Sequence, residues 1–239
     1  LPLFSKAIDY YPELSSMKVA IQKADGSIDY VHPRRPITIQ DLLRHTSGLT
    51  YGGRPDTGGS ASALYPAGAD LPSMNGTKEF ISKIAQLPLV YQPGTVFEYS
   101  VSFEMLGAIV EKVSNKSLDQ YLRDTLWAPL NMVDTGFHVP ESKKSRQARA
   151  FKLNPLDNKP QRIHPVEKDV TFECGGGCSL GTVTDYLKFG QMLVNGGALH
   201  GKRILSPQMV QLFTSNQLGK NIDNRVAHVE PHRDGYGFG

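Results

Sequence analysis

The chain has 239 residues, 39% of them hydrophobic and 21% charged, which is the composition of an ordinary globular protein long enough to bury a core. A net charge of +3 is too small to indicate nucleic-acid binding, and the excess of Lys and Arg between Lys143 and Lys168 is interpreted as a solvated surface loop. No apolar run approaches the ~20 residues that cross a bilayer, and the first residues do not form a signal peptide.

Four features are predicted ahead of residue 78. They are a short helix over residues 4–10 that ends before Pro12, a loose hairpin over residues 19–31 around the turn Asp25-Gly26-Ser27, a helix that Thr38 caps and Gly48 ends, and a long surface loop over about 51–77. A loop of that length and composition is typical of lids and substrate walls.

The segment from Gln92 to Val113 is the most informative part of the chain. A Pro-Gly turn is followed by a short extended run that contains Tyr99, and then by apolar positions with helical spacing over residues 103–113. Ser100 or Ser102 is predicted to cap that helix. The pattern places a tyrosine hydroxyl at the start of a helix, on the rim of an expected cleft.

The rest of the chain is predicted to be helical, with a second long loop. Helices are expected over residues 78–87, 118–127, 185–194 with Thr184 as cap, and 206–213 with Ser206 as cap and Pro207 in the first position. Residues 139–168 are predicted to form a polar, basic excursion. We therefore expect a single α+β domain over residues 1–239, predominantly helical.

Cys174 and Cys178 are the two cysteines, separated by Gly175-Gly176-Gly177. Two thiols at this spacing cannot complete a zinc site, and no pair of histidines at ligand spacing accompanies them, so neither metal nor cofactor is predicted. A disulfide across the glycines is sterically possible. Two free thiols are favoured, because nothing else in the sequence indicates an oxidising compartment.

Four segments resemble a known family in the right order. They are Ile37 to Leu49, with the run Leu-Leu-Arg-His-Thr-Ser-Gly-Leu; Pro93-Gly94 to Val101 with Leu106-Gly107; Ala128 to Phe137; and Gly181 to Phe189. Together they resemble the serine β-lactamase-related hydrolases, which include class C β-lactamases, DD-peptidases and family VIII carboxylesterases. Tyr-Ser-Val at residues 99–101 is more similar to the esterase branch.

The resemblance implies acyl transfer through a serine ester, on a small carboxylic ester or a β-lactam-like amide. In such a site a lysine in Ser-x-x-Lys spacing activates the serine, and a tyrosine passes the proton to the leaving group. Tyr99 matches that tyrosine. Ser100, Val101 and the glycines Gly175, Gly176 and Gly177 are the candidates for lining the substrate cleft. His45 is interpreted as a helix-ending residue, and Trp127 and Tyr186 as core or rim aromatics.

By the family's pattern, the nucleophile should lie upstream of Leu1. The one Ser-x-x-Lys in the chain begins at Ser15, but a strand and turn follow it where a long apolar helix is required, so Ser15 is interpreted as an exposed polar residue. No third motif follows Gly239. Because the chain also begins without Met, we expect a fragment: the helical portion of the β-lactamase-like (penicillin-binding) fold, with little of its main antiparallel sheet.

Two alternatives stay open. Gly177-Cys178-Ser179-Leu180-Gly181 fits the Gly-x-Ser-x-Gly nucleophile elbow of α/β-hydrolases, with Asp223 and His228 as possible partners of Ser179. The missing βα alternation argues against it and favours a glycine-rich loop beside the cleft. The other alternative is a catalytically silent relative or fragment that binds an acyl or peptide ligand.

Overall fold

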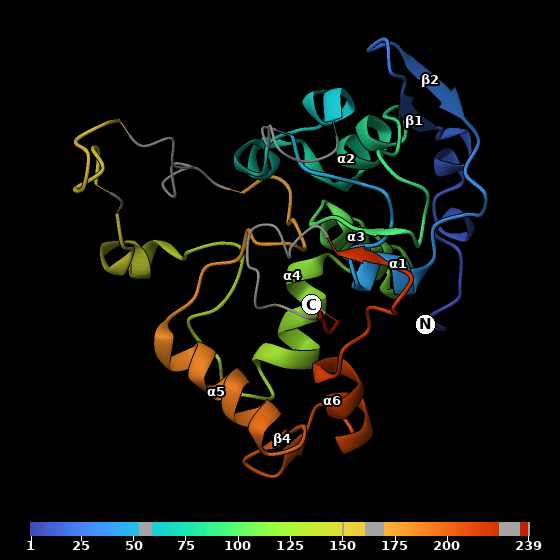
Figure 1. The fold of residues 1–239 in the computed structure, drawn as a ribbon. Helices are drawn as coiled ribbons and strands as arrows, with labels where there is room; N and C mark the ends of the chain where they lie inside the picture. Colours follow the sequence, from blue (N-terminus) through green and yellow to red (C-terminus); the bar gives the residue numbers. More distant parts are fainter. Residues whose placement is uncertain (53–58, 150, 161–169, 225–234, 239) are drawn as a thin grey trace.

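A computed structural model describes residues 1–239 except 53–58, 150, 161–169, 225–234 and 239 (Figure 1). The α-helices are α1 (Ile39–Leu43), α2 (Gly76–Ile84), α3 (Ser102–Ser114), α4 (Leu118–Leu122), α5 (Val183–Val194) and α6 (Pro207–Thr214). Short 3-10 helices are η1 (Ala7–Asp9), η2 (Pro12–Ser16), η3 (Gly59–Leu64), η4 (Gly68–Ser73) and η6 (Glu141–Arg146), and η5 (Arg123–Trp127) is π-helical.

The described strands form three separate pairs. They are β1 (Val19–Gln22) antiparallel to β2 (Ile28–Val31), β3 (Val96–Phe97) parallel to β6 (Asp223–Asn224), and β4 (Ala198–Leu199) antiparallel to β5 (Lys202–Arg203). The β1–β2 hairpin confirms the prediction over residues 19–31. Within the residues described, helices dominate and the sheets have two strands each.

Helix α3 lies at the centre of the fold, beside α1 (Figure 1). Its apolar residues Met105, Ala108 and Ile109 are at most 1% exposed and pack into one hydrophobic cluster with α1, α2 and the N-terminal segment. A second cluster, around α4 and α5, contains Trp127 and Met192. Cys178 contacts both clusters, so the glycine-rich loop lies where the two cores meet.

Hydroxyl side chains begin several helices as the sequence predicts. Thr38 and Ser206 each accept a hydrogen bond from a backbone N–H of the first turn, and Pro207 takes the first position of α6. The cap of α5 is Thr182, which accepts from the Asp185 N–H, so the prediction of Thr184 was wrong by two residues. Either threonine precedes the same apolar stripe, so periodicity alone could not separate them.

The predicted cap of α3 was also wrong. Val101 occupies the N-cap position and no side chain caps the helix. The hydroxyls of Ser100 and Ser102 hydrogen-bond to each other instead, 2.7 Å apart. Residues 59–77 of the predicted loop contain η3, η4 and the first residues of α2, so this part has more regular structure than predicted. Residues 4–10 contain η1 alone as a helical turn.

Cys174 and Cys178 form a disulfide, which corrects the preference for free thiols. The physical reason is the turn between them: the Cys178 N–H donates to the Cys174 carbonyl at 3.4 Å, and the two Cα atoms lie 5.3 Å apart, within the range that a disulfide spans. Among the helices described, none has the length and apolarity to cross a membrane.

Candidate active site

Tyr99 lies just ahead of α3, and its side chain is 40% exposed. Its ring rests on that of His45, with centroids 4.5 Å apart and planes tilted by 34°, and the Tyr51 ring lies 5.9 Å away. Phe103 and Tyr236 pack against other parts of the His45 ring, at 4.9 and 5.6 Å. The phenol of Tyr99 is thus the exposed edge of an aromatic cluster whose centre is His45.

His45 ends α1, as predicted, although Gly48 does not. The Thr46 N–H donates to the Asp41 carbonyl at 2.8 Å and the His45 N–H to the Leu42 carbonyl at 3.3 Å, which is the hydrogen-bond pattern of a Schellman C-cap. His45 occupies the left-handed position of that cap, with φ of 54°. Its side chain is 1% exposed and points under Tyr99.

A line of buried hydroxyls runs from His45 into the start of α3. The Ser100 Oγ lies 3.2 Å from His45 Nδ1 and 2.7 Å from the Ser102 Oγ, which in turn lies 2.8 Å from the Ser47 Oγ. All three serines are fully buried. The hydroxyls satisfy one another where no water can reach them, which a buried polar group requires.

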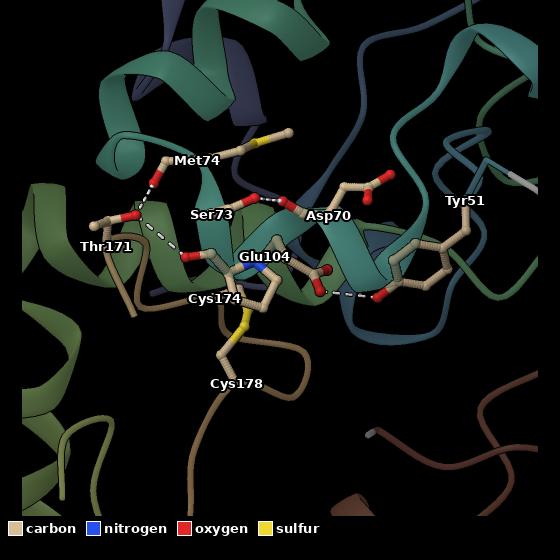
Figure 2. The surroundings of a disulfide bond; sticks show 9 residues. Tyr51, Asp70, Ser73, Met74, Glu104, Thr171, Cys174 and Cys178 are labelled. Carbon is tan, nitrogen blue, oxygen red and sulfur yellow. Dashed lines mark hydrogen bonds between the residues drawn. A yellow bond between two sulfur atoms is a disulfide. The ribbon is translucent and has the colours of Figure 1, made fainter. Parts of the chain in front are cut away.

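Two buried carboxyl groups flank Tyr99 in the sequence. Glu98 accepts from the Thr50 hydroxyl at 3.1 Å. Glu104 accepts from the Tyr51 hydroxyl at 2.9 Å (Figure 2). Burial raises the pKa of Glu104 above its ordinary range, against the hydrogen bonds from its own backbone N–H and from Tyr51. Burial thus disfavours the charged form of the Glu104 carboxyl relative to that of an exposed glutamate.

The glycine-rich loop lies directly on α3. A Cβ atom at Gly175 would sit 2.3 Å from the Phe103 carbonyl oxygen, and one at Gly176 would sit 2.3 Å from the Glu104 carboxyl. Figure 2 shows Glu104 between Tyr51 and the disulfide that closes this loop. Gly176, Glu104, Tyr51 and Tyr99 are thus connected by successive contacts.

The other residues predicted to line the cleft differ in their exposure. Ser100 and Val101 are fully buried, so their side chains support Tyr99 from within the fold and do not face solvent beside it. Gly175, Gly176 and Gly177 are exposed. Ser15 is exposed in η2, a 3-10 helix of five residues rather than a long buried helix.

Ser179 does not occupy a nucleophile elbow. It is exposed, its neighbour Leu180 bridges to Gly136, and α5 begins only at Val183. A strand, a sharp turn and a helix with the serine at the apex are required there, and residues 170–183 contain no strand. Of the proposed partners, Asp223 lies in β6, and His228 lies outside the described residues.

A cavity of about 370 Å³ lies between segment 133–148 and residues 180–182, and Tyr99 is not among the residues that line it. Its charged groups are already paired, since Asp134 forms ion pairs with Lys143 and Arg146. Among the described residues, no cluster of His, Cys, Asp and Glu could hold a metal ion.

The sequence matches the Beta-lactamase family over residues 9–239. This chain belongs to the Beta-lactamase family. Protein Rv1367c of Mycobacterium tuberculosis is 35% identical over 231 residues, which cover 95% of this chain and 56% of that protein. A putative D-alanyl-D-alanine carboxypeptidase of Escherichia coli O157:H7 is 27% identical over 81% of this chain and 46% of that protein. The chain spans about half the length of these curated relatives.

Solved structures show the same fold. The unliganded selenomethionyl form of simvastatin synthase (LovD) from Aspergillus terreus matches the whole chain with a TM-score of 0.74 at 22% identity, and the chain covers 61% of it. EstCE1, described as a hydrolase with promiscuous acyltransferase activity, matches with a TM-score of 0.71 at 25% identity and the same coverage. The family excludes the α/β-hydrolase alternative, and its members include hydrolases and acyltransferases.

The sequence predicts a role for Tyr99, which stays a prediction, but does not predict the residues that surround it in the structure. The support comes from Ser47, His45 and Tyr51, some fifty residues earlier, and from Glu104 inside α3. The sequence offered one signal for His45: this residue lies where the helix of the Leu43 to Leu49 motif is expected to end, three residues before Gly48. A helix that ends before a nearby glycine has another type of residue in its cap.

Proposed function

We propose that this chain is the Tyr99-bearing part of a serine hydrolase that acts on small carboxylic esters by acyl-enzyme chemistry. The nucleophilic serine and its lysine are supplied by a Ser-x-x-Lys helix that precedes Leu1 in the complete protein. The observation that carries the proposal is the placement of Tyr99: a phenol 40% exposed, held on a buried histidine at the start of the central helix.

In the proposed reaction the serine Oγ bonds to the ester carbonyl carbon and the bond to the leaving alkoxide breaks. The serine proton passes through the Tyr99 hydroxyl to the departing oxygen, which leaves as an alcohol. Water then attacks the acyl-enzyme, and the acid is released as the serine regains its proton. In each half-reaction the Tyr99 hydroxyl accepts one proton and gives one up, so its protonation state is the same at the end as at the start. The role therefore depends on the position of the hydroxyl.

Three observations support ester chemistry. Tyr99 is followed by Ser-Val, which resembles the esterase branch. A lovastatin esterase of Penicillium rubens is 30% identical over 52% of the chain, and the esterase EstB of Burkholderia gladioli is 34% identical over 51%. The match with EstCE1 adds a hydrolase of similar fold.

A fluorophosphonate label on the complete protein, followed by peptide mapping, tests the nucleophile. Labelling of a serine upstream of Leu1 is the expected result. Labelling of Ser15 or Ser179 would overturn the placement of the nucleophile. A folded protein that takes no label and hydrolyses no p-nitrophenyl ester would instead be a catalytically silent relative, which contradicts the proposal.

Replacement of Tyr99 by Phe tests the relay. Turnover of a p-nitrophenyl ester should fall by roughly 10²- to 10⁴-fold, because the phenol oxygen that carries the proton is lost. Tyr186→Phe is the matched control, since Tyr186 lies on α5 with 72% of its side chain exposed. Normal turnover in Tyr99→Phe would refute the relay.

A further inference from the structure

His45 takes a backbone conformation that glycine usually provides. The left-handed residue of a Schellman cap is Gly in most helices, because a Cβ atom is strained there. His45 holds this position with φ of 54° although Gly48, three residues on, was available to end the helix. A residue in a strained backbone conformation persists where the surrounding structure holds it there. The contacts of the His45 side chain are therefore expected to offset the strain.

The backbone N–H groups of the residues before and after Tyr99 both donate to His45. The Glu98 N–H donates to the His45 carbonyl oxygen at 2.9 Å, and the Ser100 N–H donates to His45 Nδ1 at 3.2 Å. The imidazole ring between these two bonds lies against the Tyr99 ring at 4.5 Å. One residue thus fixes the backbone before Tyr99, the backbone after it, and the ring itself.

The hydrogen bond from Ser100 also determines the state of the imidazole. A backbone N–H can only donate, so Nδ1 must be an acceptor and cannot carry a proton. The ring is therefore neutral, with its proton on Nε2. Protonation of Nδ1 would place two donors against each other and break one of the two bonds that hold the Tyr99 backbone.

His45 is itself rigidly held. The Asp41 carboxylate beneath the cap accepts hydrogen bonds from Arg35 at 2.9 Å and from the Thr46 hydroxyl at 3.0 Å. Burial opposes ionisation of Asp41, yet the bonds from Arg35 and Thr38 lower its pKa below the ordinary range, so the carboxylate stays charged. The end of α1 therefore gives His45 a fixed base.

We propose that His45 is a positioning residue for the Tyr99 relay: its carbonyl, its Nδ1 and its ring together hold the phenol where the substrate ester binds. This inference rests on the proposed function. It differs from a purely structural role for His45, because loss of the side chain should lower turnover by displacing Tyr99 while the fold and substrate binding persist. A displacement near 1 Å costs about 100-fold in rate.

Nitrogen-15 NMR of the histidines in the unmodified protein tests the hydrogen-bond pattern without any substitution. The expected spectrum at neutral pH has a His45 Nδ1 signal of the unprotonated type and a protonated Nε2. A signal that shows a proton on Nδ1 would overturn the proposal, since Ser100 could not then donate to it.

Kinetics of the complete protein test the consequence. His45→Gly keeps the left-handed backbone and removes the ring and the acceptor, and kcat for a p-nitrophenyl ester should fall about 100-fold with KM nearly unchanged. His45→Asn also tolerates the left-handed position and offers an oxygen near the place of Nδ1. Its kcat should be about tenfold above that of the Gly variant, because the bond from Ser100 returns.

Ile84→Ala is the matched control for stability. Ile84 is fully buried on α2, which contains neither Tyr99 nor the end of α1, so this variant should melt at a lower temperature with kcat unchanged. If His45→Gly keeps the parent kcat while Tyr99→Phe loses activity, the positioning role is wrong and the relay stands. If Tyr99→Phe itself keeps normal turnover, the relay is wrong and the positioning role of His45 fails with it. The NMR spectrum then still shows which imidazole nitrogen of His45 carries the proton.

Discussion

Gly175 and Gly177 occupy the same exposed loop, yet an added side chain would meet different surroundings at each. A Cβ at Gly175 would lie 2.3 Å from the Phe103 carbonyl oxygen, whereas none of the atoms described lies within 4 Å of one at Gly177. Gly175→Ala should therefore lower the free energy of unfolding by about 1–3 kcal/mol, because α3 and the loop must separate. Gly177→Ala is the control, and urea titration measures both; equal stability of the two variants would contradict the close packing.

Glu104 gives the protein a pH-dependent weakness. Burial raises the pKa of its carboxyl, so between the ordinary carboxyl pKa and the raised one the folded state binds more protons than the unfolded state. The free energy of unfolding therefore decreases as pH rises through that window. Glu104→Gln keeps an oxygen for the Tyr51 hydroxyl and removes the ionisation, so it should be more stable than the parent at neutral pH and equal to it in acid.

Urea titrations at several pH values between acid and neutrality measure this difference. Glu141→Gln is the control, because the Glu141 side chain is 86% exposed and a change there should leave the pH slope as it was. A Glu104→Gln variant with the same slope as the parent would mean that the buried carboxyl does not titrate as its surroundings indicate.

The position of Tyr99 ahead of a helix could be predicted from the sequence, because a turn, an extended run and a helix surround it within twenty residues. His45 and Tyr51 could not be joined to it, because their contacts with Tyr99 span about fifty residues of chain and depend on how α1 packs against α3. The burial of Ser100 has the same origin: local pattern gave it a role as a helix cap, and tertiary packing gave it another partner.

At the scale of structural elements, the contribution of the disulfide loop to stability can be measured separately. The Cys174–Cys178 bond closes a turn in which Gly176 lies close to the Glu104 carboxyl. Closing so short a loop stabilises a fold by about 2 kcal/mol in the chain-entropy account. A dithiol reductant should lower the free energy of unfolding by that amount, while the Cys174→Ala/Cys178→Ala double variant should not respond to the reductant. An identical urea midpoint for the oxidised and reduced parent would contradict this.

Helix positions were predictable to within a few residues, because the 3.6-residue period and the Ser or Thr cap residues lie in the local sequence. Thr38 and Asp41 form a reciprocal capping box, as their spacing predicts. The same spacing at Thr182 and Asp185 gives a cap without the return bond, since the Asp185 carboxylate accepts from the Asp134 N–H and the Thr135 hydroxyl. The local pattern located these helices, and long-range partners determined what the acidic side chain does.

For the molecule as a whole, the two hydrophobic clusters are expected to unfold together. The single tryptophan, Trp127, is 5% exposed in the cluster around α4 and α5, so its fluorescence reports that cluster. Far-UV circular dichroism reports all helices. Because Cys178 packs against both clusters, we predict one cooperative unit, with urea transitions that coincide for the two signals.

Substitution in the distant cluster makes the prediction stricter. Leu42 lies in the cluster around α1 and α3, and Leu42→Ala should lower stability by about 2–5 kcal/mol through the cavity it leaves. In a single cooperative unit the Trp127 transition must move to lower urea by the same amount as the circular dichroism transition, although Trp127 belongs to the other cluster. A Trp127 transition that stays in place while the helical signal shifts would show two independently folding parts and refute the single domain over residues 1–239.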